Sequence, residues 1–168
     1  MAESHLEPTV AETLKAAMRG LASSVSIIST GDKHGQRAAM TATSATSLTF
    51  DPPAMLVCIN RDAWIYGILR EDANFCINVL GADQLALAQA CGGRIKGPDR
   101  FAMGVWRDEE GVPVLADAQA AILCGQARRL SFGTHDIIVG NVKKVVLGES
   151  IDPLLYINGA YKRVGMAV

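Results

Sequence analysis

Hydroxyl-bearing side chains are concentrated in one short stretch of the sequence, residues 40–47, where alanines separate them. The hydroxyls belong to Thr41, Thr43, Ser44, Thr46 and Ser47, and the alanines are Ala42 and Ala45. Small side chains let a flat ligand approach the backbone closely, and hydroxyls and free amides can bond a phosphate or the polar edge of a ring. A half-exposed strand with threonines on its wet face would give the same pattern, and composition alone favours that plainer interpretation.

Arg61 is a second candidate for ligand binding, because it follows the apolar run 54–60 directly. A guanidinium at a strand end can hold a phosphate through two parallel hydrogen bonds. A solvated surface arginine is about equally compatible with the residues alone. Asp62 puts a negative charge beside this position unless it points away as a helix cap.

Several other chemistries are disfavoured. The sequence contains no GxGxxG, GxxxxGK[ST], GxSxG or HExxH motif, and its four cysteines form no CxxC pair. A metal site is therefore not expected. Cys58 and Cys76 lie in apolar runs and are predicted to be buried, free thiols.

The formal charge of −1 gives no basic footprint for nucleic acid. Because no export signal or membrane-length apolar run is visible, we expect a soluble, cytoplasmic protein with no membrane contact.

The elements around these residues are predominantly strands. A helix is predicted after Thr9, which forms a capping box with Glu12. Asp62 is predicted to cap a short helix, a second helix is predicted at 82–91, and residues 94–111 are expected to be irregular. Strands are predicted at 24–30, 37–49, 54–60, 74–80, 118–131 and 135–147, and near residues 154 and 160–164.

The strands do not alternate regularly with helices, which disfavours a doubly wound parallel sheet. The chain's length of 168 residues suits a single domain, residues 1–168. The pattern predicts a mainly β fold, a closed or partly closed antiparallel barrel with short inserted helices.

The stretch TATSATSLTFDPPAMLVCINR closely resembles the signature of the short-chain flavin reductases, the reductase components of two-component flavin monooxygenases. KGPDRF, GTHDIIVGNV and LLYINGAY fit the same family in the same order, so the resemblance covers about residues 18–163. It implies an FMN-binding split barrel. One departure is that Asp62 and Ala63 stand where many relatives carry a serine or threonine, so amides and Arg61 would hold more of the phosphate.

The resemblance also implies roles for individual residues. The flavin ring would lie along residues 41–45, and the ribityl chain and phosphate would meet residues 58–61. His135 would lie by the nicotinamide, Arg100 would offset charge on the reduced flavin, Phe101 would shield one ring face and Tyr161 would close over the site. The cofactor-binding set is thus Thr41, Ala42, Thr43, Ser44, Ala45, Cys58, Ile59, Asn60, Arg61, Arg100, Phe101 and Tyr161, with His135 as the catalytic residue.

Each role has a structural alternative. Arg100 could be solvated, Phe101 could anchor its loop in the core, and Tyr161 could be an ordinary aromatic of a strand pair. For His135, which is next to Asp136, the alternative is a purely structural role in which it pins the turn through Asp136.

The family activity implied is NAD(P)H-dependent reduction of FMN, with FAD also possible and with NADH or NADPH as donor, in a homodimer that supplies a partner oxygenase. One alternative is a flavoprotein that retains FMN and reduces another acceptor, such as a cob(II) corrinoid. Another is a flavin-binding module without turnover, which His135 disfavours because a pure binder needs no nicotinamide contact.

Overall fold

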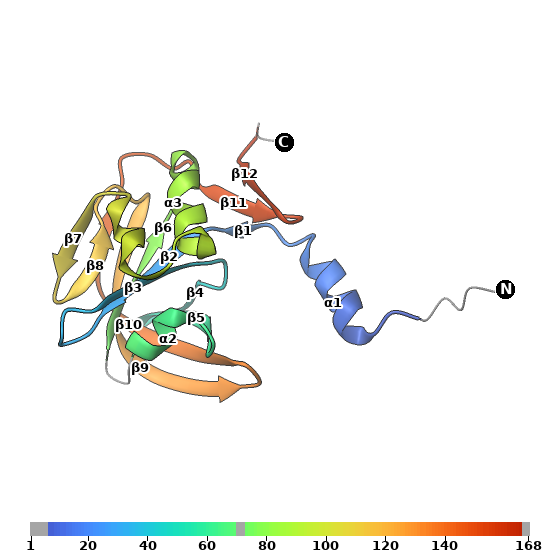
Figure 1. The fold of residues 1–168 in the computed structure, drawn as a ribbon, viewed down its shortest axis with the longest axis horizontal. Coiled ribbons are helices and arrows are strands. Elements are labelled where there is room, and N and C mark those ends of the chain that lie inside the picture. Colours follow the sequence, from blue (N-terminus) through green and yellow to red (C-terminus); the bar gives the residue numbers. More distant parts are fainter. Residues whose placement is uncertain (1–6, 70–72, 166–168) are drawn as a thin grey trace.

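The computed structural model describes residues 7–69 and 73–165 and begins with the predicted helix, α1 (Val10–Met18). Its capping box is present: the Glu12 amide donates to Thr9 Oγ1 at 3.3 Å, and the Thr9 amide donates to Glu12 Oε2 at 2.8 Å. The helix projects away from the rest of the molecule, and none of its residues is buried (Figure 1).

The body of the molecule is a seven-stranded antiparallel sheet. In spatial order the strands are β3 (Arg37–Ala42), β2 (Ser26–Gly31), β6 (Asn74–Val79), β9 (Ala120–Phe132), β10 (His135–Leu147), β5 (Pro53–Asn60) and β4 (Thr46–Phe50). The two edge strands, β3 and β4, are joined by residues 43–45 alone, which span at most about 15 Å. The sheet must therefore curl until its edges approach one another, which confirms the predicted split barrel.

The curled sheet encloses the main hydrophobic core. Phe75 and Ile77 project from one face of β6, because side chains two residues apart on a strand share a face, and both are fully buried. Ile59 and Ile138 reach the same core from β5 and β10. The helix α2 (Trp64–Ile68) buries Ile65 and Ile68 against it, so this short helix closes one part of the barrel.

Two predictions about chain segments were wrong. The predicted strand 37–49 is two strands, β3 and β4, because the chain leaves the ladder at residues 43–45. Asp62 does not cap α2: the N-cap is Ala63, with no side-chain cap bond, and the Asp62 amide instead donates to Asn60 Oδ1 at 2.9 Å. The side chain of Asn60 thus shapes the turn between β5 and α2.

The segment between residues 82 and 102 is largely helical. It comprises η1 (Ala82–Gln84), α3 (Leu85–Gln89), η2 (Ala90–Arg94), which is a π-turn, and η3 (Gly97–Ala102). Thus the predicted helix 82–91 is present in three short pieces. The 3-10 turn η3 replaces part of the irregular segment predicted at 94–111.

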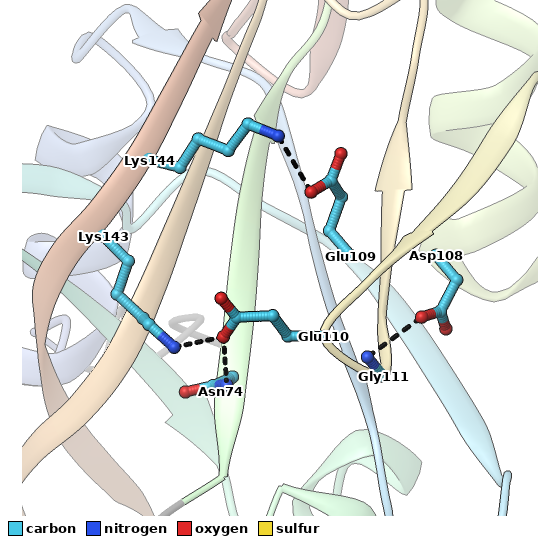
Figure 2. A network of polar contacts seen from close by, with 7 residues as sticks. All are labelled: Asn74, Asp108, Glu109, Glu110, Gly111, Lys143 and Lys144. Carbon is cyan, nitrogen blue, oxygen red and sulfur yellow. Dashed lines mark hydrogen bonds and ion pairs between the residues drawn. The ribbon is translucent and has the colours of Figure 1, made fainter.

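A hairpin begins in that segment and extends beyond it: β7 (Trp106–Glu109) pairs with β8 (Val112–Leu115). The sequence pattern missed it because every residue of β8 is buried, which removes the alternation of apolar and polar residues. Figure 2 shows how its turn is held: the Gly111 amide donates to Asp108, Lys143 pairs with Glu110, and Lys144 pairs with Glu109 at 2.8 Å. These exposed pairs attach the hairpin to β10.

A small sheet of β1 (Ser23–Ser24), β11 (Leu154–Ile157) and β12 (Ala160–Arg163) completes the fold. Asn158 and Gly159 form the predicted tight turn, with φ values of 50° and 76°. Within residues 7–69 and 73–165, no helix is long and apolar enough to span a bilayer.

Candidate flavin and nicotinamide site

The break between β3 and β4 is held open by one side chain, Ser44. Its hydroxyl donates to the carbonyl oxygen of Cys58 at 3.0 Å and accepts from the Cys58 amide at 3.3 Å. Continuing the register from the Thr46–Leu56 pair would place Ser44 opposite Cys58, so the side chain replaces a main-chain partner. The backbone of residues 43–45 therefore belongs to neither ladder, which leaves a small-residue segment beside the end of β5.

The end of β5 meets the β9–β10 turn. Asn60 is the cross-strand partner of His135, and the Arg61 amide donates to the carbonyl oxygen of Thr134 at 3.0 Å. The Arg61 guanidinium, which is exposed, donates to the carbonyl oxygen of Gly133. Residues 44, 58, 60, 61 and 135 are thus joined in one continuous corner.

His135 is exposed at the start of β10, and its Nδ1 lies 2.9 Å from the hydroxyl oxygen of Thr134. No other residue in the described part of the chain bonds the ring. The structural alternative, in which His135 pins the turn through Asp136, is wrong, because the Asp136 carboxylate faces the interior and bonds other residues.

The sequence analysis missed the polar cluster behind His135. Asp136 is fully buried, and its carboxylate accepts hydrogen bonds from Ser131 and from Tyr66 of α2. The Ser131 hydrogen bond is the largest cause of a lowered Asp136 pKa. The Tyr66 bond and the positive charges of Arg129 and Arg61 lower it further, while burial opposes them. A carboxylate and a tyrosine 70 residues apart give no local sequence signal.

Thr41 and Tyr161 both lie close to Gly92. The Thr41 hydroxyl donates to the carbonyl oxygen of Ala88 at 2.6 Å and so attaches β3 to α3. A Cβ atom on Gly92 would lie 3.7 Å from the Tyr161 hydroxyl and 3.8 Å from the Thr41 side chain. Tyr161 also packs edge-on against its cross-strand partner, Tyr156, with ring centroids 5.2 Å apart, a distance typical of such pairs.

Arg100 is buried, not solvated, with an exposed fraction of 8%. Its Nε donates to the carbonyl oxygen of Ile95 at 2.7 Å, and a second nitrogen donates to that of Ala39 at 2.5 Å. The guanidinium carbon lies 5.6 Å from the centre of the Trp64 ring. Arg100 thereby attaches η3 to β3 and touches the helix that follows Arg61.

Phe101 is held by packing contacts. It packs against a second group of buried residues, which includes Leu87 and Leu115, and contacts Trp106 edge-on, with ring centroids 5.0 Å apart. Arg37 covers its ring at 4.5 Å. These contacts fit the alternative in which Phe101 anchors its loop.

The remaining predicted binding residues differ in what they can offer. The side chains of Ala42 and Ile59 are buried, so these residues can contact a ligand only through the backbone. Thr43 is exposed, and Ala45 and Cys58 are half-buried, which corrects the prediction that Cys58 is fully buried. All four cysteines are free thiols.

The corner has the groups that a flavin mononucleotide needs. The segment 43–45 offers backbone outside the ladders and an exposed threonine hydroxyl, which suit the polar edge of a ring. Arg61 offers an exposed cation at the strand end, which suits a phosphate. The residues therefore fit the group.

Comparisons with known proteins agree with this geometry. Residues 18–165 match the model of the flavin reductase like domain. The chain is 40% identical over 146 residues to the FMN reductase (NADH) RutF of Pseudomonas syringae pv. syringae, covering 86% of this chain and 82% of that protein. It is 36% identical over 158 residues to the reductase component of an FADH(2)-dependent resorcinol hydroxylase of Rhizobium sp., covering 90% and 86%.

A solved structure agrees as well. The flavin reductase component of a bacterial two-component tryptophan halogenase, BorF, superposes with a TM-score of 0.83 at 30% identity, covering 94% of this chain and 99% of that chain. Sequence and structure thus give the same assignment over nearly the whole chain, which belongs to the flavin reductase like domain family.

Proposed function

We propose that this protein is an NADH-dependent FMN reductase that supplies reduced flavin to a separate oxygenase. The observation that carries the proposal is the corner where Ser44, Arg61 and His135 meet through Cys58 and Asn60. Similar proteins named as NADH-dependent FMN reductases and as the reductase component of a hydroxylase support the same assignment. The proposal places flavin and nicotinamide on adjoining parts of one surface.

In this arrangement the flavin ring lies along residues 41–45. The hydroxyls of Thr41 and Ser44 are already bonded within the protein, so Thr43 and the backbone provide the polar contacts. The phosphate lies at Asn60 and Arg61, where the guanidinium exchanges the Gly133 carbonyl for a charged oxygen. A hydrogen bond to a charged partner is about twice as strong as a neutral one, so the exchange is favourable.

His135 holds the nicotinamide dinucleotide. Its Nδ1 is occupied by the Thr134 hydroxyl, which leaves Nε2 to contact the carboxamide or the pyrophosphate. A bound flavin supplies the ring that accepts electrons, and the protein supplies binding and orientation. Arg100 contributes through Trp64, which it holds next to the phosphate corner.

The test is a pair of measurements on the purified protein. FMN titration should show saturable binding, and NADH oxidation should depend on added FMN. FAD and NADPH serve as comparison substrates, and an oxygenase that accepts free reduced flavin should be supported across a dialysis membrane. A protein that neither binds FMN nor oxidises NADH in its presence would contradict the proposal.

We also propose that two copies associate through α1. Val10 and Leu14 on this helix are 86% and 59% exposed, and Met18 continues the same apolar stripe. A helix of nine residues is marginally stable in water without tertiary packing, so this face requires a partner. A second copy suits it because Glu7 and Glu12 lie toward one end of the segment and Lys15 and Arg19 toward the other, so antiparallel pairing sets opposite charges together.

Light scattering after size-exclusion chromatography tests this association. The unchanged protein should have the mass of a dimer, and Leu14→Lys should have that of a monomer with an unchanged β-sheet spectrum. Lys33→Ala, in the exposed turn between β2 and β3, is the control variant and should remain dimeric. A monomeric unchanged protein, or a dimeric Leu14→Lys variant, would contradict the assignment of this face.

A further inference from the structure

Asp136 is a buried carboxylate that contacts two different parts of the fold. It follows His135 directly, yet it lies on the opposite face of β10 and is fully buried. One carboxylate oxygen accepts from the Ser131 hydroxyl at 2.8 Å, and the other accepts from the Tyr66 hydroxyl at 3.0 Å. Arg129 lies 3.7 Å from the second oxygen. Each oxygen therefore accepts a hydrogen bond from a different element, β9 or α2.

The two elements adjoin the two halves of the site. Ser131 belongs to β9, pairs with Asp136 across the hairpin, and lies next to the turn that presents His135. Tyr66 belongs to α2, which begins three residues after Arg61. Ile59, also paired with Asp136, precedes the Asn60–Arg61 corner on β5. Asp136 thus connects the hairpin and α2 through its carboxylate, and β5 through the backbone ladder.

Arg129 extends the connection to the far end of α2. Its guanidinium donates to the carbonyl oxygen of Leu69 at 2.6 Å and to Gln126 at 3.2 Å, and it covers the Tyr66 ring at 5.3 Å. Arg129 Nε is buried and has no hydrogen-bond partner within the described residues. An orphaned buried donor and a buried carboxylate are both costly, and apolar side chains of similar size would stabilise the fold at least as well. The polar cluster is therefore better explained by the geometry that it fixes.

We propose that Asp136 is a positioning residue that fixes the flavin-phosphate corner and the His135 turn relative to each other. This rests on the proposed function above. The Tyr66 bond holds the flavin side, since α2 continues from Arg61, and the Ser131 bond holds the nicotinamide side, since it braces the hairpin turn. Both hydroxyls are engaged by the Asp136 carboxylate.

Separate removal of the two hydroxyls tests the inference. Tyr66→Phe should raise the Kd for FMN roughly threefold to tenfold and leave the KM for NADH nearly unchanged, as expected for one lost hydrogen bond. Ser131→Ala should raise the KM for NADH by a similar factor and leave FMN binding nearly unchanged. Asp136→Asn should raise both. Ser131→Thr, which keeps the hydroxyl, should restore the KM, and Ser150→Ala on the surface is the matched control.

A purely structural cluster gives a different result. The three variants would then share a lower melting temperature. In Tyr66→Phe and Ser131→Ala, the Kd for FMN and the KM for NADH would stay at their original values or move together, and either outcome overturns the proposal. If Asp136→Asn fails to fold, the two hydroxyl variants still decide. Failure of the proposed function is seen separately, because the unchanged protein would then show no FMN binding and no FMN-dependent NADH oxidation.

Discussion

The Ser44 hydroxyl and the main chain of Cys58 form a reciprocal pair of hydrogen bonds, at 3.0 and 3.3 Å, where β4 would otherwise continue along β5. The Ser44 side chain thus bonds the amide and the carbonyl of Cys58, which would otherwise lack a main-chain partner on this side of β5. This relationship explains why a segment rich in threonine and serine occurs in the barrel. The sheet is completed at Cys58, while the backbone of residues 43–45 is released from both ladders to line the site.

Arg61→Ala should weaken FMN binding by about 1.5–3 kcal/mol, because it removes a charged hydrogen bond to the phosphate. Fluorescence titration with FMN measures this loss. Riboflavin, which lacks the phosphate, should bind the variant and the unchanged protein about equally. Arg61→Lys keeps the charge and should lose less. Equal losses for riboflavin and FMN would show that Arg61 acts only through the Gly133 carbonyl.

The four thiols should differ sharply in reactivity. Burial raises the pKa of Cys76 and Cys124 to about 12 and that of Cys91 to about 11, so these thiols stay protonated and enclosed near neutral pH. Cys58 is half-buried at the end of β5, beside the proposed flavin. A disulfide reagent should therefore titrate one thiol in the native protein and four after unfolding.

Saturating FMN should slow that single reaction, and Cys58→Ala should abolish it. Reaction of two or more native thiols would contradict the burial pattern. A reaction rate that FMN leaves unchanged would place the flavin away from Cys58.

Arg100→Gln should lower the thermal stability of the protein more than it changes turnover at saturating FMN. The substitution removes two charged hydrogen bonds, to Ala39 and Ile95, of which each is worth about 1.5–3 kcal/mol. Arg128→Gln is the matched control, because Arg128 is exposed on β9. Calorimetry and steady-state kinetics on both variants make the comparison. A slower turnover at unchanged melting temperature would mean that Arg100 acts on the flavin itself.

The sequence predicted those elements whose determinants are local. The capping box of Thr9 and Glu12 and the turn at Asn158 and Gly159 depend on neighbouring residues alone, and both are present. The break at residues 43–45 was missed because no glycine or proline marks it. It depends instead on the Ser44 hydroxyl reaching Cys58, 14 residues away.

The placement of the predicted site residues also depends on more than local sequence. Residues 41–45, 58–61 and 135 came from the family resemblance, and the structure joins residues 44, 58, 60, 61 and 135 in one corner. The buried partners were not predictable. Arg100 is a charged residue in a glycine-rich segment, a pattern typical of solvated loops, and only the packed structure shows the carbonyls that it bonds. Asp136 likewise depends on Tyr66 of α2, a residue brought close by the fold.

His135→Ala should raise the KM for NADH several-fold and leave FMN binding nearly unchanged. A neutral hydrogen bond contributes about 0.5–1.5 kcal/mol, so its loss weakens the dinucleotide complex without abolishing turnover. Because the ring is exposed and its one protein contact is the adjacent Thr134 hydroxyl among the described residues, its removal should hardly change the melting temperature.

Thr134→Val is the matched variant for this test. It removes the contact to Nδ1 but keeps the imidazole, so it should raise the KM less than His135→Ala does. Steady-state kinetics with NADH, combined with thermal unfolding, measures both effects on the same preparations. A histidine with only a structural role would show the reverse result, a lower melting temperature at an unchanged KM. That result would remove His135 from the nicotinamide site and leave Arg61 and residues 43–45 as a flavin site without a recognised donor contact.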